Sequence, residues 1–265
     1  MIFPKIVGIL NVTPDSFSDG GMFFNPESAI CWGLKLLEEG AEIIDVGGES
    51  TRPGSEPVPV EEELRRVCPV IEGIKKEKPD AIISIDTTKY EVAEKAIELG
   101  ATIINDVSGL QYDERMATLA AKNNCTLIIM HMQGTPRTMQ INPTYNDVVE
   151  DIFDFLERKI EFARSCGVQK IIADVGIGFG KTVEHNWDLL RRFVRFYDLN
   201  VPLMLGISRK SFIGKTLGID NPIERDIPTV LLHALLLKYR IDYIRVHNVH
   251  LVNVLKVLYH KLYAS

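Results

Sequence analysis

Residues that could bind a ligand or take part in chemistry recur along the chain, each just after a short apolar run. They are carboxylates, amides, cations and histidines: Asn11, Asp45, Asp86, Asn105, His131, Asp174, Ser208, Arg209, Lys210, Arg245 and His247. Carboxylates and amides can read the polar edge of a ring, and lysine and arginine can hold an anion. The spacing therefore indicates one site to which many separate elements contribute.

The elements that must position these residues alternate between strand-like and helical patterns. Apolar runs typical of strands begin near Ile6, Glu42, Ala81, Thr102, Thr126, Lys170, Pro202 and Asp242. Asn25 and Pro26 are suited to the first two positions of the first helix, and Gly40 and Gly100 are suited to the ends of the first and third helices. The chain thus reads as eight strand-helix units.

Two features favour a (β/α)8 TIM barrel formed by a single domain, residues 1–265. The strands are rich in Ile and Val without strict alternation, as expected for a parallel sheet covered by helices. Polar residues follow nearly every strand, and in a barrel these positions meet at the C-terminal mouth. A doubly wound sheet would concentrate function at one switch point instead.

Composition narrows the class of protein further. The 265 residues are 46% hydrophobic and 25% charged, which suits one globular domain. A net charge of -6 argues against a nucleic-acid binder. The four cysteines lie far apart without metal-ligand spacing, and the apolar run at residues 230–237 is too short to cross a bilayer. We therefore expect a soluble cytoplasmic protein with reduced thiols.

Two loops, at residues 11–25 and 47–59, are unusually long and rich in Gly, Ser, Thr, Asp and Pro. Long loops of this kind are commonly lids or binding loops, and the alternative is plain surface. Phe17 and Arg52 are unusual residues for a surface loop without a binding role, which favours a lid.

The same two loops carry a strong resemblance to a known family. Residues 11–21 read NVTPDSFSDGG and residues 45–54 read DVGGESTRPG. Shorter matches follow in family order at residues 85–87, 104–107, 176–181, 208–211 and 245–247. Across the whole chain the sequence resembles the dihydropteroate synthases. It departs from them at Val175, where proline is usual, and at Asn248, where aspartate is common; we expect a looser loop around Asp174 and altered support of His247.

The resemblance implies a transferase of folate biosynthesis, a sulfonamide target that forms a homodimer. It would join (7,8-dihydropterin-6-yl)methyl diphosphate to 4-aminobenzoate and release pyrophosphate. The family uses Mg²⁺, and Asn11 matches the residue that contacts the ion. Diphosphate oxygens and water can supply the other ligands, so no protein cage is needed. No membrane and no nucleic acid take part.

The pterin ring has adjacent donors on one edge and acceptors on the other. Asp174 suits the 2-amino and N3–H edge, and Lys210 suits O4 and N5. Around the ring, the motifs and the resemblance imply contacts from Asp86, Asn105, Met130 and Arg209, with the Arg209 guanidinium stacked on the ring face. The alternative is that Asp86 and Asp174 only cap the following helices.

A diphosphate requires cations and hydrogen-bond donors, and Thr51, Arg52, Arg245 and His247 are the candidates. Arg245 and His247 share a strand face because they are two residues apart. For 4-aminobenzoate, Phe17 and Pro53 would supply apolar faces. Ser211, with the helix that it opens, would bind the carboxylate, and Lys210 would lie beside both substrates.

The chain needs no paired nucleophile because the arylamine itself attacks. We expect departure of the diphosphate to be aided by Mg²⁺, Arg52, Arg245 and His247, with Asp86 stabilising a pterin-methylene cation. Closure of the first two loops would place Asp19 near the reacting carbon, by analogy to the family. The pterin substrate would therefore bind before the arylamine.

Other patterns are assigned to structure. The glycine-rich residues 176–182 fit neither the Walker nor the dinucleotide spacing and predict a turn close to the pterin. His131 and His185 are expected to be structural. In the helix expected at residues 249–262, Leu251, Val254, Leu255 and Leu258 fit a core-facing stripe.

Two other functions fit parts of the sequence. A pterin-binding methyltransferase domain that serves a corrinoid partner would share the ring contacts, but it would not need the anion cluster or the Phe17 loop. A catalytically silent barrel that serves as a binding subunit would keep the fold, since fold alone does not prove function.

Overall fold

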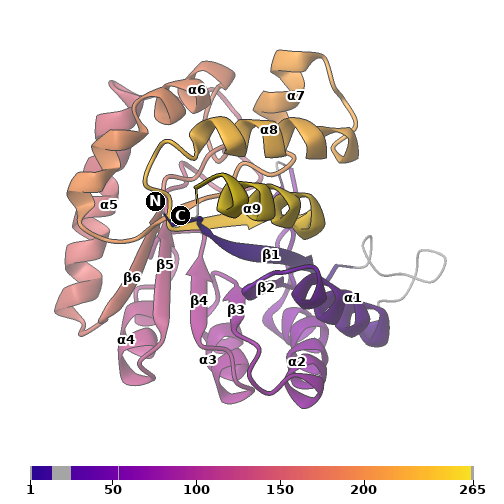
Figure 1. The fold of residues 1–265 in the computed structure, drawn as a ribbon. Helices are drawn as coiled ribbons and strands as arrows, with labels where there is room; N and C mark the ends of the chain where they lie inside the picture. Colours follow the sequence, from indigo (N-terminus) through magenta and orange to yellow (C-terminus); the bar gives the residue numbers. More distant parts are fainter. Residues whose placement is uncertain (1, 14–24, 53, 264–265) are drawn as a thin grey trace.

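Eight parallel strands close into a barrel, and helices cover its outside (Figure 1). The computed structural model describes residues 2–13, 25–52 and 54–263. The strands are β1 (Lys5–Asn11), β2 (Ile43–Gly47), β3 (Ile83–Asp86), β4 (Ile103–Asp106), β5 (Thr126–Met130), β6 (Lys170–Asp174), β7 (Leu203–Leu205) and β8 (Tyr243–Val246). The predicted barrel is confirmed, and each strand begins close to the residue expected from the sequence.

Helices alternate with the strands and form the outer layer. They are α1 (Pro26–Glu38), α2 (Val60–Glu77), α3 (Tyr90–Glu98), α4 (Arg115–Lys122), α5 (Val148–Ser165), α6 (Val183–Arg191), α7 (Ser211–Leu217), α8 (Asp226–Leu236) and α9 (Val249–Tyr263), with 3-10 turns η1 (Phe193–Leu199) and η2 (Ile223–Arg225). Within the residues described, none of these helices is both long and apolar enough to cross a membrane.

The predicted ends of α1 are confirmed. The Asn25 side chain accepts a hydrogen bond from the Ser28 amide at 3.2 Å, with Pro26 in the first turn. Gly40 follows the helix at φ +108°, and a Cβ there would come within 2.8 Å of Asn253 in α9. Only glycine fits this backbone and this close contact.

Two apolar layers hold the barrel together. A large core fills the space between strands and helices. A smaller cluster fills the bottom of the barrel: Val7, Ile43, Ile103, Ile128, Ile172 and Met204. The parallel pairing of β1 with β8, from Lys5–Tyr243 to Gly8–Val246, closes the ring. Inward-facing residues two positions further along each strand must therefore lie one layer higher, toward the mouth.

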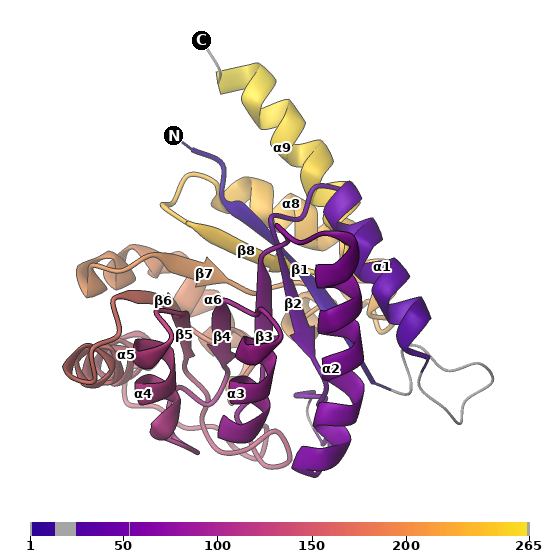
Figure 2. The ribbon, with the colours of Figure 1, turned by 90° about the horizontal axis from the view of Figure 1, so that it is seen from below.

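The prediction for the last helix was partly wrong. In α9, Val254 and Leu258 are 45% and 62% exposed, and Leu251 and Leu255 are only half-buried. The residues that α9 buries are Val249, Val252 and Tyr259. Helical spacing alone did not show which side of the apolar stripe faces the barrel. Figure 2 shows α9 running alongside α8 and continuing past the end of the barrel.

Candidate active site

A polar layer lies directly above the apolar floor of the barrel. Each member of this layer lies two residues after an inward-facing residue of the same strand. The members are Asp45, Asp86, Asn105, Asp174 and Arg245. Four of the five, the three aspartates and the asparagine, are at most 7% exposed. The strand period thus turns the predicted strand-end residues into one cluster at the mouth.

Arg245 forms the centre of this layer. Its Nε lies 2.6 Å from Oδ2 of Asp45, and its Nη2 lies 2.7 Å from Oδ2 of Asp86. The amide Nδ2 of Asn105 also donates to Asp45 Oδ2, at 2.9 Å. One guanidinium therefore neutralises two buried carboxylates, and one carboxylate orients both neighbours. Asp45, which the sequence marked only as a strand end, is a central member of the site.

The opposite oxygens of these groups are free to accept further hydrogen bonds. Oδ1 of Asp45, Asp86 and Asn105 is buried in each case without a hydrogen-bond partner in the described structure. Burial raises the pKa of the Asp86 carboxyl to about 7; the Arg245 charge opposes this shift and the Asp45 charge adds to it. Buried polar atoms normally find partners, so these acceptors indicate a site for a ligand with several donors.

Asp174 and Lys210 lie on the other side of the mouth. The Gly176 amide donates to Asp174 Oδ1 at 2.8 Å, and Val175 is fully buried, so the loop expected to be loose is well packed. Lys210 Nζ lies 3.9 Å from the centre of the Phe179 ring. Burial lowers the pKa of Lys210 to about 8, Arg245 adds to this, and Asp174 and Asp86 oppose it.

Phe179 is a residue of the mouth that was not predicted from the sequence. It lies in the glycine-rich segment and packs with the predicted Met130 in a small apolar cluster at the mouth, together with Val107, Met132 and Met139. A large aromatic residue within a run of glycines was the available signal. The cluster gives the polar layer an apolar wall.

His247 lies at the centre of the positive charge. The pKa of its imidazole is lowered to about 3, first by burial and then by the charges of Arg209, Arg245, Lys210 and Arg52. Its backbone amide donates to Ser208 Oγ at 3.1 Å, and Ser208 Oγ lies 2.9 Å from its Nδ1. His247 is therefore neutral at ordinary pH and held by Ser208.

Arg209 is held from behind by an ion pair that the sequence did not reveal. Its Nε and Nη2 lie 2.6 and 2.8 Å from the two oxygens of Asp226 at the start of α8. Asn248 Nδ2 donates to Asp226 at 3.0 Å, and Asn248 Oδ1 accepts the Leu251 amide at 3.1 Å. Asn248, which stands where the family commonly has aspartate, therefore binds Asp226 and the first turn of α9.

The remaining predicted residues are partly described. Thr51 is half-buried and Arg52 is exposed in the β2–α2 loop, and Asn11 is half-buried at the end of β1. Phe17, Asp19 and Pro53 lie outside the described residues. The described residues contain no cluster of three or more histidine, cysteine or acidic side chains that could hold a metal ion.

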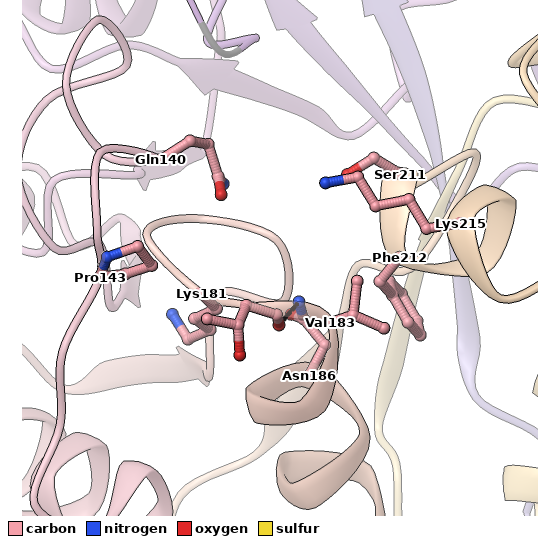
Figure 3. A pocket seen from close by; sticks show the side chains of 9 residues that line it. Gln140, Pro143, Lys181, Val183, Asn186, Ser211, Phe212 and Lys215 are labelled. Carbon is pink, nitrogen blue, oxygen red and sulfur yellow. Dashed lines mark hydrogen bonds between the residues drawn. The ribbon is translucent and has the colours of Figure 1, made fainter.

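Ser211 opens α7 beside a cavity of about 210 Å³. Figure 3 shows Ser211 and Lys215 on one side of this cavity and Lys181 and Asn186 on another, with Gln140 facing them. The two histidines expected to be structural both bind other groups of the protein. His131 is buried against Lys181, with 3.0 Å between Nδ1 and Nζ, and His185 completes the capping box of α6.

With this geometry established, comparison with known proteins identifies the family. Residues 7–247 match the family model described as pterin binding enzyme. The dihydropteroate synthase of Haemophilus influenzae is 45% identical over 249 residues, 93% of this chain and 89% of the relative. The chain belongs to the dihydropteroate synthases. It therefore has dihydropteroate synthase activity, a transferase step of folate biosynthesis.

Solved structures of dihydropteroate synthases agree with this fold. The Xanthomonas albilineans enzyme with 4-aminobenzoic acid has a TM-score of 0.91 at 40% identity, covering 99% of this chain and 94% of that chain. The Thermus thermophilus enzyme in complex with 6HMPPP has a TM-score of 0.85 at 38% identity, covering 98% and 94%. The barrel fold is thus shared with dihydropteroate synthases whose structures hold ligands.

Proposed function

We propose that the mouth of the barrel binds (7,8-dihydropterin-6-yl)methyl diphosphate and then 4-aminobenzoate, and joins them with release of pyrophosphate. The observation that carries this assignment is the juxtaposition of unpartnered buried acceptors with a cluster of cations. A reduced pterin presents ring donors, and its diphosphate presents negative charge. Both halves of the site are therefore complementary to one molecule.

In the pterin half, Asp174 accepts from the 2-amino group and N3–H, and the Lys210 ammonium donates to O4 and N5. Asn105 serves as an acceptor, because one of its amide hydrogens is already given to Asp45 and its Oδ1 is unpartnered. Asp86 faces the ring with its free Oδ1. Met130 forms the apolar wall, and Arg209, oriented by Asp226, stacks on the exposed ring face.

In the diphosphate half, Arg52, Thr51 and His247 bind the phosphate oxygens. Ser208 Oγ already accepts the His247 amide, so its hydroxyl can donate to Nδ1, which leaves the proton of the neutral ring on Nε2. Nε2–H then donates to the leaving group. Arg245 contributes its positive charge while it remains bound to Asp45 and Asp86.

Magnesium could be held in this half with few protein ligands. The amide oxygen of Asn11 is a hard ligand at the end of β1, and diphosphate oxygens and water would supply the other ligands. Bound Mg²⁺ would neutralise charge on the leaving pyrophosphate. Asn11 would fix the position of the ion relative to Arg52.

Catalysis then consists of drawing off pyrophosphate and directing the arylamine. Asp86 stabilises positive charge on the pterin methylene through its free oxygen. Ser211 binds the carboxylate of 4-aminobenzoate, Phe17 and Pro53 cover its ring, and Lys210 lies between the substrates. Asp19 approaches the reacting carbon when the first loops close. The arylamine binds second because part of its pocket is built by these loops.

The test is pyrophosphate release by purified protein with the dihydropterin diphosphate and Mg²⁺, with and without 4-aminobenzoate, followed by mass detection of dihydropteroate. Product formation that requires both substrates is the expected result. Pterin binding without pyrophosphate release would contradict the proposed roles of the residues at the mouth.

We also propose that the protein is a homodimer that uses α8 and α9. Apolar side chains at intervals of four residues along η2 and α8 are 61–71% exposed: Ile223, Ile227, Leu231 and Leu235. Exposed Val254, Leu258 and Leu262 lie on the neighbouring α9 (Figures 1 and 2). Several large apolar side chains exposed on two neighbouring helices are typical of protein interfaces. The free thiols of all four cysteines fit the cytoplasmic location predicted from the sequence.

A further inference from the structure

A cluster of three charges, one buried and two half-buried, lies at the base of the loop that carries Thr51 and Arg52. Nζ of Lys89, at the start of α3, lies 2.7 Å from Oε2 of Glu49 and 2.5 Å from Oε2 of Glu63. Glu63 lies in α2 with a completely buried side chain, and the other two side chains are at most 20% exposed. No role in ligand binding was predicted for these three residues.

Glu49 also joins the two ends of this loop. Its Oε2 accepts the backbone amide of Val58 at 2.7 Å, so one carboxylate oxygen binds both Val58 and Lys89. Arg66 of α2 holds the adjacent Gly48 carbonyl at 2.8 Å. Glu49 and Val58, at the two ends of the loop, are therefore held together, and we call this contact with Lys89 and Glu63 the neck of the loop.

The segment beyond the neck is also organised. Ser55 Oγ lies 2.5 Å from the Ser50 carbonyl oxygen and 2.8 Å from the Arg52 carbonyl oxygen, so its one hydroxyl hydrogen can donate to either. The Gly54 amide donates to the carbonyl of Pro136 in the β5–α5 loop at 3.0 Å. The backbone around Arg52 is therefore held by contacts within the loop and by the β5–α5 loop, and the neck holds its two ends against the barrel.

We propose that Glu49, held in place by Lys89 and Glu63, is a positioning residue for the diphosphate end of the pterin substrate. It touches no substrate; it closes the neck of the loop and so sets the positions of Thr51 and Arg52. A misplacement of about 1 Å in such groups can cost orders of magnitude in rate. The inference rests on the proposed diphosphate contact of Arg52.

The variant Glu49→Ala tests this role because it leaves Lys89 paired with Glu63, so that no buried charge loses its only partner. Two ligands separate the halves of the site: the dihydropterin diphosphate and its alcohol, 6-hydroxymethyl-7,8-dihydropterin. Calorimetry should show about tenfold weaker binding of the diphosphate and little change for the alcohol. Glu49→Gln keeps an oxygen acceptor for Val58 and should restore most of the affinity.

The matched control is Glu56→Ala in the same loop. The Glu56 side chain is 69% exposed and 3.6 Å from Arg137, outside the neck, so neither affinity should change. Hydrogen exchange gives a readout independent of activity: the Val58 amide should exchange faster in Glu49→Ala and remain protected in Glu56→Ala.

Equal weakening of both ligands in Glu49→Ala would overturn the proposal, as would unchanged diphosphate affinity where Arg52→Ala loses it. If Arg52→Ala also leaves the diphosphate affinity unchanged, the proposed contact between Arg52 and the diphosphate is wrong. The role of Glu49 in closing the loop is then judged by hydrogen exchange alone. Faster exchange of the Val58 amide in Glu49→Ala would support that role, and unchanged protection would contradict it.

Discussion

Nη2 of Arg245 lies 2.7 Å from Oδ2 of Asp86 at the mouth of the barrel. The same guanidinium binds Asp45 at 2.6 Å. Arg245 was predicted to be a cation for the diphosphate. Its position shows a second effect, because its positive charge offsets the repulsion between two neighbouring buried carboxylates. Oδ1 of Asp86 then remains available to accept a hydrogen bond from a ligand, because Oδ2 is already bound by Arg245.

Removal of this guanidinium should destabilise the protein in a pH-dependent way. In Arg245→Ala, the pKa of Asp86 rises further above its ordinary range. A carboxyl whose pKa is raised by folding contributes stability at low pH that is lost as the pH rises through the raised value. Urea unfolding should therefore show a loss of about 3 kcal/mol at about pH 8.5 and a smaller loss at about pH 6.

Arg209→Ala is the matched control for this measurement. Its partner Asp226 has a pKa lowered below the ordinary value by hydrogen bonds from Arg209 and Asn248, despite partial burial. Asp226 is therefore charged throughout this range, and its stability loss should be similar at the two pH values. An equal loss at both pH values in Arg245→Ala would contradict the burial of ionised Asp86.

Turnover should follow a narrow bell-shaped pH profile. In the proposed mechanism Asp86 acts as a carboxylate and Lys210 acts as an ammonium. The ratio kcat/KM should therefore fall as the pH drops below about 7 and fall again as the pH rises above about 8. The midpoints belong to the interacting pair rather than to each residue alone. Steady-state rates across this range, with the dihydropterin diphosphate limiting, give the profile.

Asp86→Asn should remove the acidic limb from the residual activity and leave the alkaline limb in place. An acidic limb that persists in this variant, or a wild-type midpoint near the ordinary value of an aspartate, would exclude Asp86 as the group that titrates. Thermal unfolding of the variant at about pH 8 separates loss of function from loss of fold, and the variant should be no less stable because the amide needs no buried charge.

Many residues of the candidate site could be predicted from the sequence, because side chains two positions apart on a strand point to the same side of the barrel. Asp45, Asp86, Asn105, Asp174 and Arg245 are marked by their position at strand ends, and closure of the barrel brings them together. Such local signals survive folding, since they depend only on where each strand ends.

The partners of these residues could not be predicted in the same way. Asp45 and Arg245 are 200 positions apart, and Arg209 meets Asp226 from a different element. Which hydrogen of Asn105 is already used, and which side of α9 faces solvent, depend on packing between elements distant in sequence. Patterns within a segment contain no record of that packing.

Ser208 should control the diphosphate contact of His247. In Ser208→Ala, Nδ1 of His247 loses its partner at 2.9 Å, so the proton is no longer kept on Nε2 and the ring is free to turn. We expect KM for the dihydropterin diphosphate to rise about tenfold, with KM for 4-aminobenzoate nearly unchanged.

Ser208→Thr keeps the hydroxyl and is the control, because it should retain the low KM if the hydrogen bond is what matters. Since the pKa of His247 is about 3, affinity for the diphosphate should not increase between about pH 8 and about pH 6 through protonation of this ring. An increase that disappears in His247→Gln would show that the imidazole titrates and that its surroundings are less cationic than described.

The exposed apolar surface of α8 should control the oligomeric state. Leu231 is 61% exposed at the middle of the row from Ile223 to Leu235. A carboxylate there, present on both copies, would be desolvated in a two-fold interface that uses this surface, which is costly. Leu231→Asp should therefore convert the dimer to a monomer in light scattering coupled to size exclusion, at concentrations where wild type remains dimeric.

The control is Val194→Asp. Val194 is an apolar residue of η1 that is 52% exposed and lies outside this surface, so this variant should remain dimeric. A monomeric wild-type protein, or dissociation by Val194→Asp alone, would refute an interface on α8 and α9.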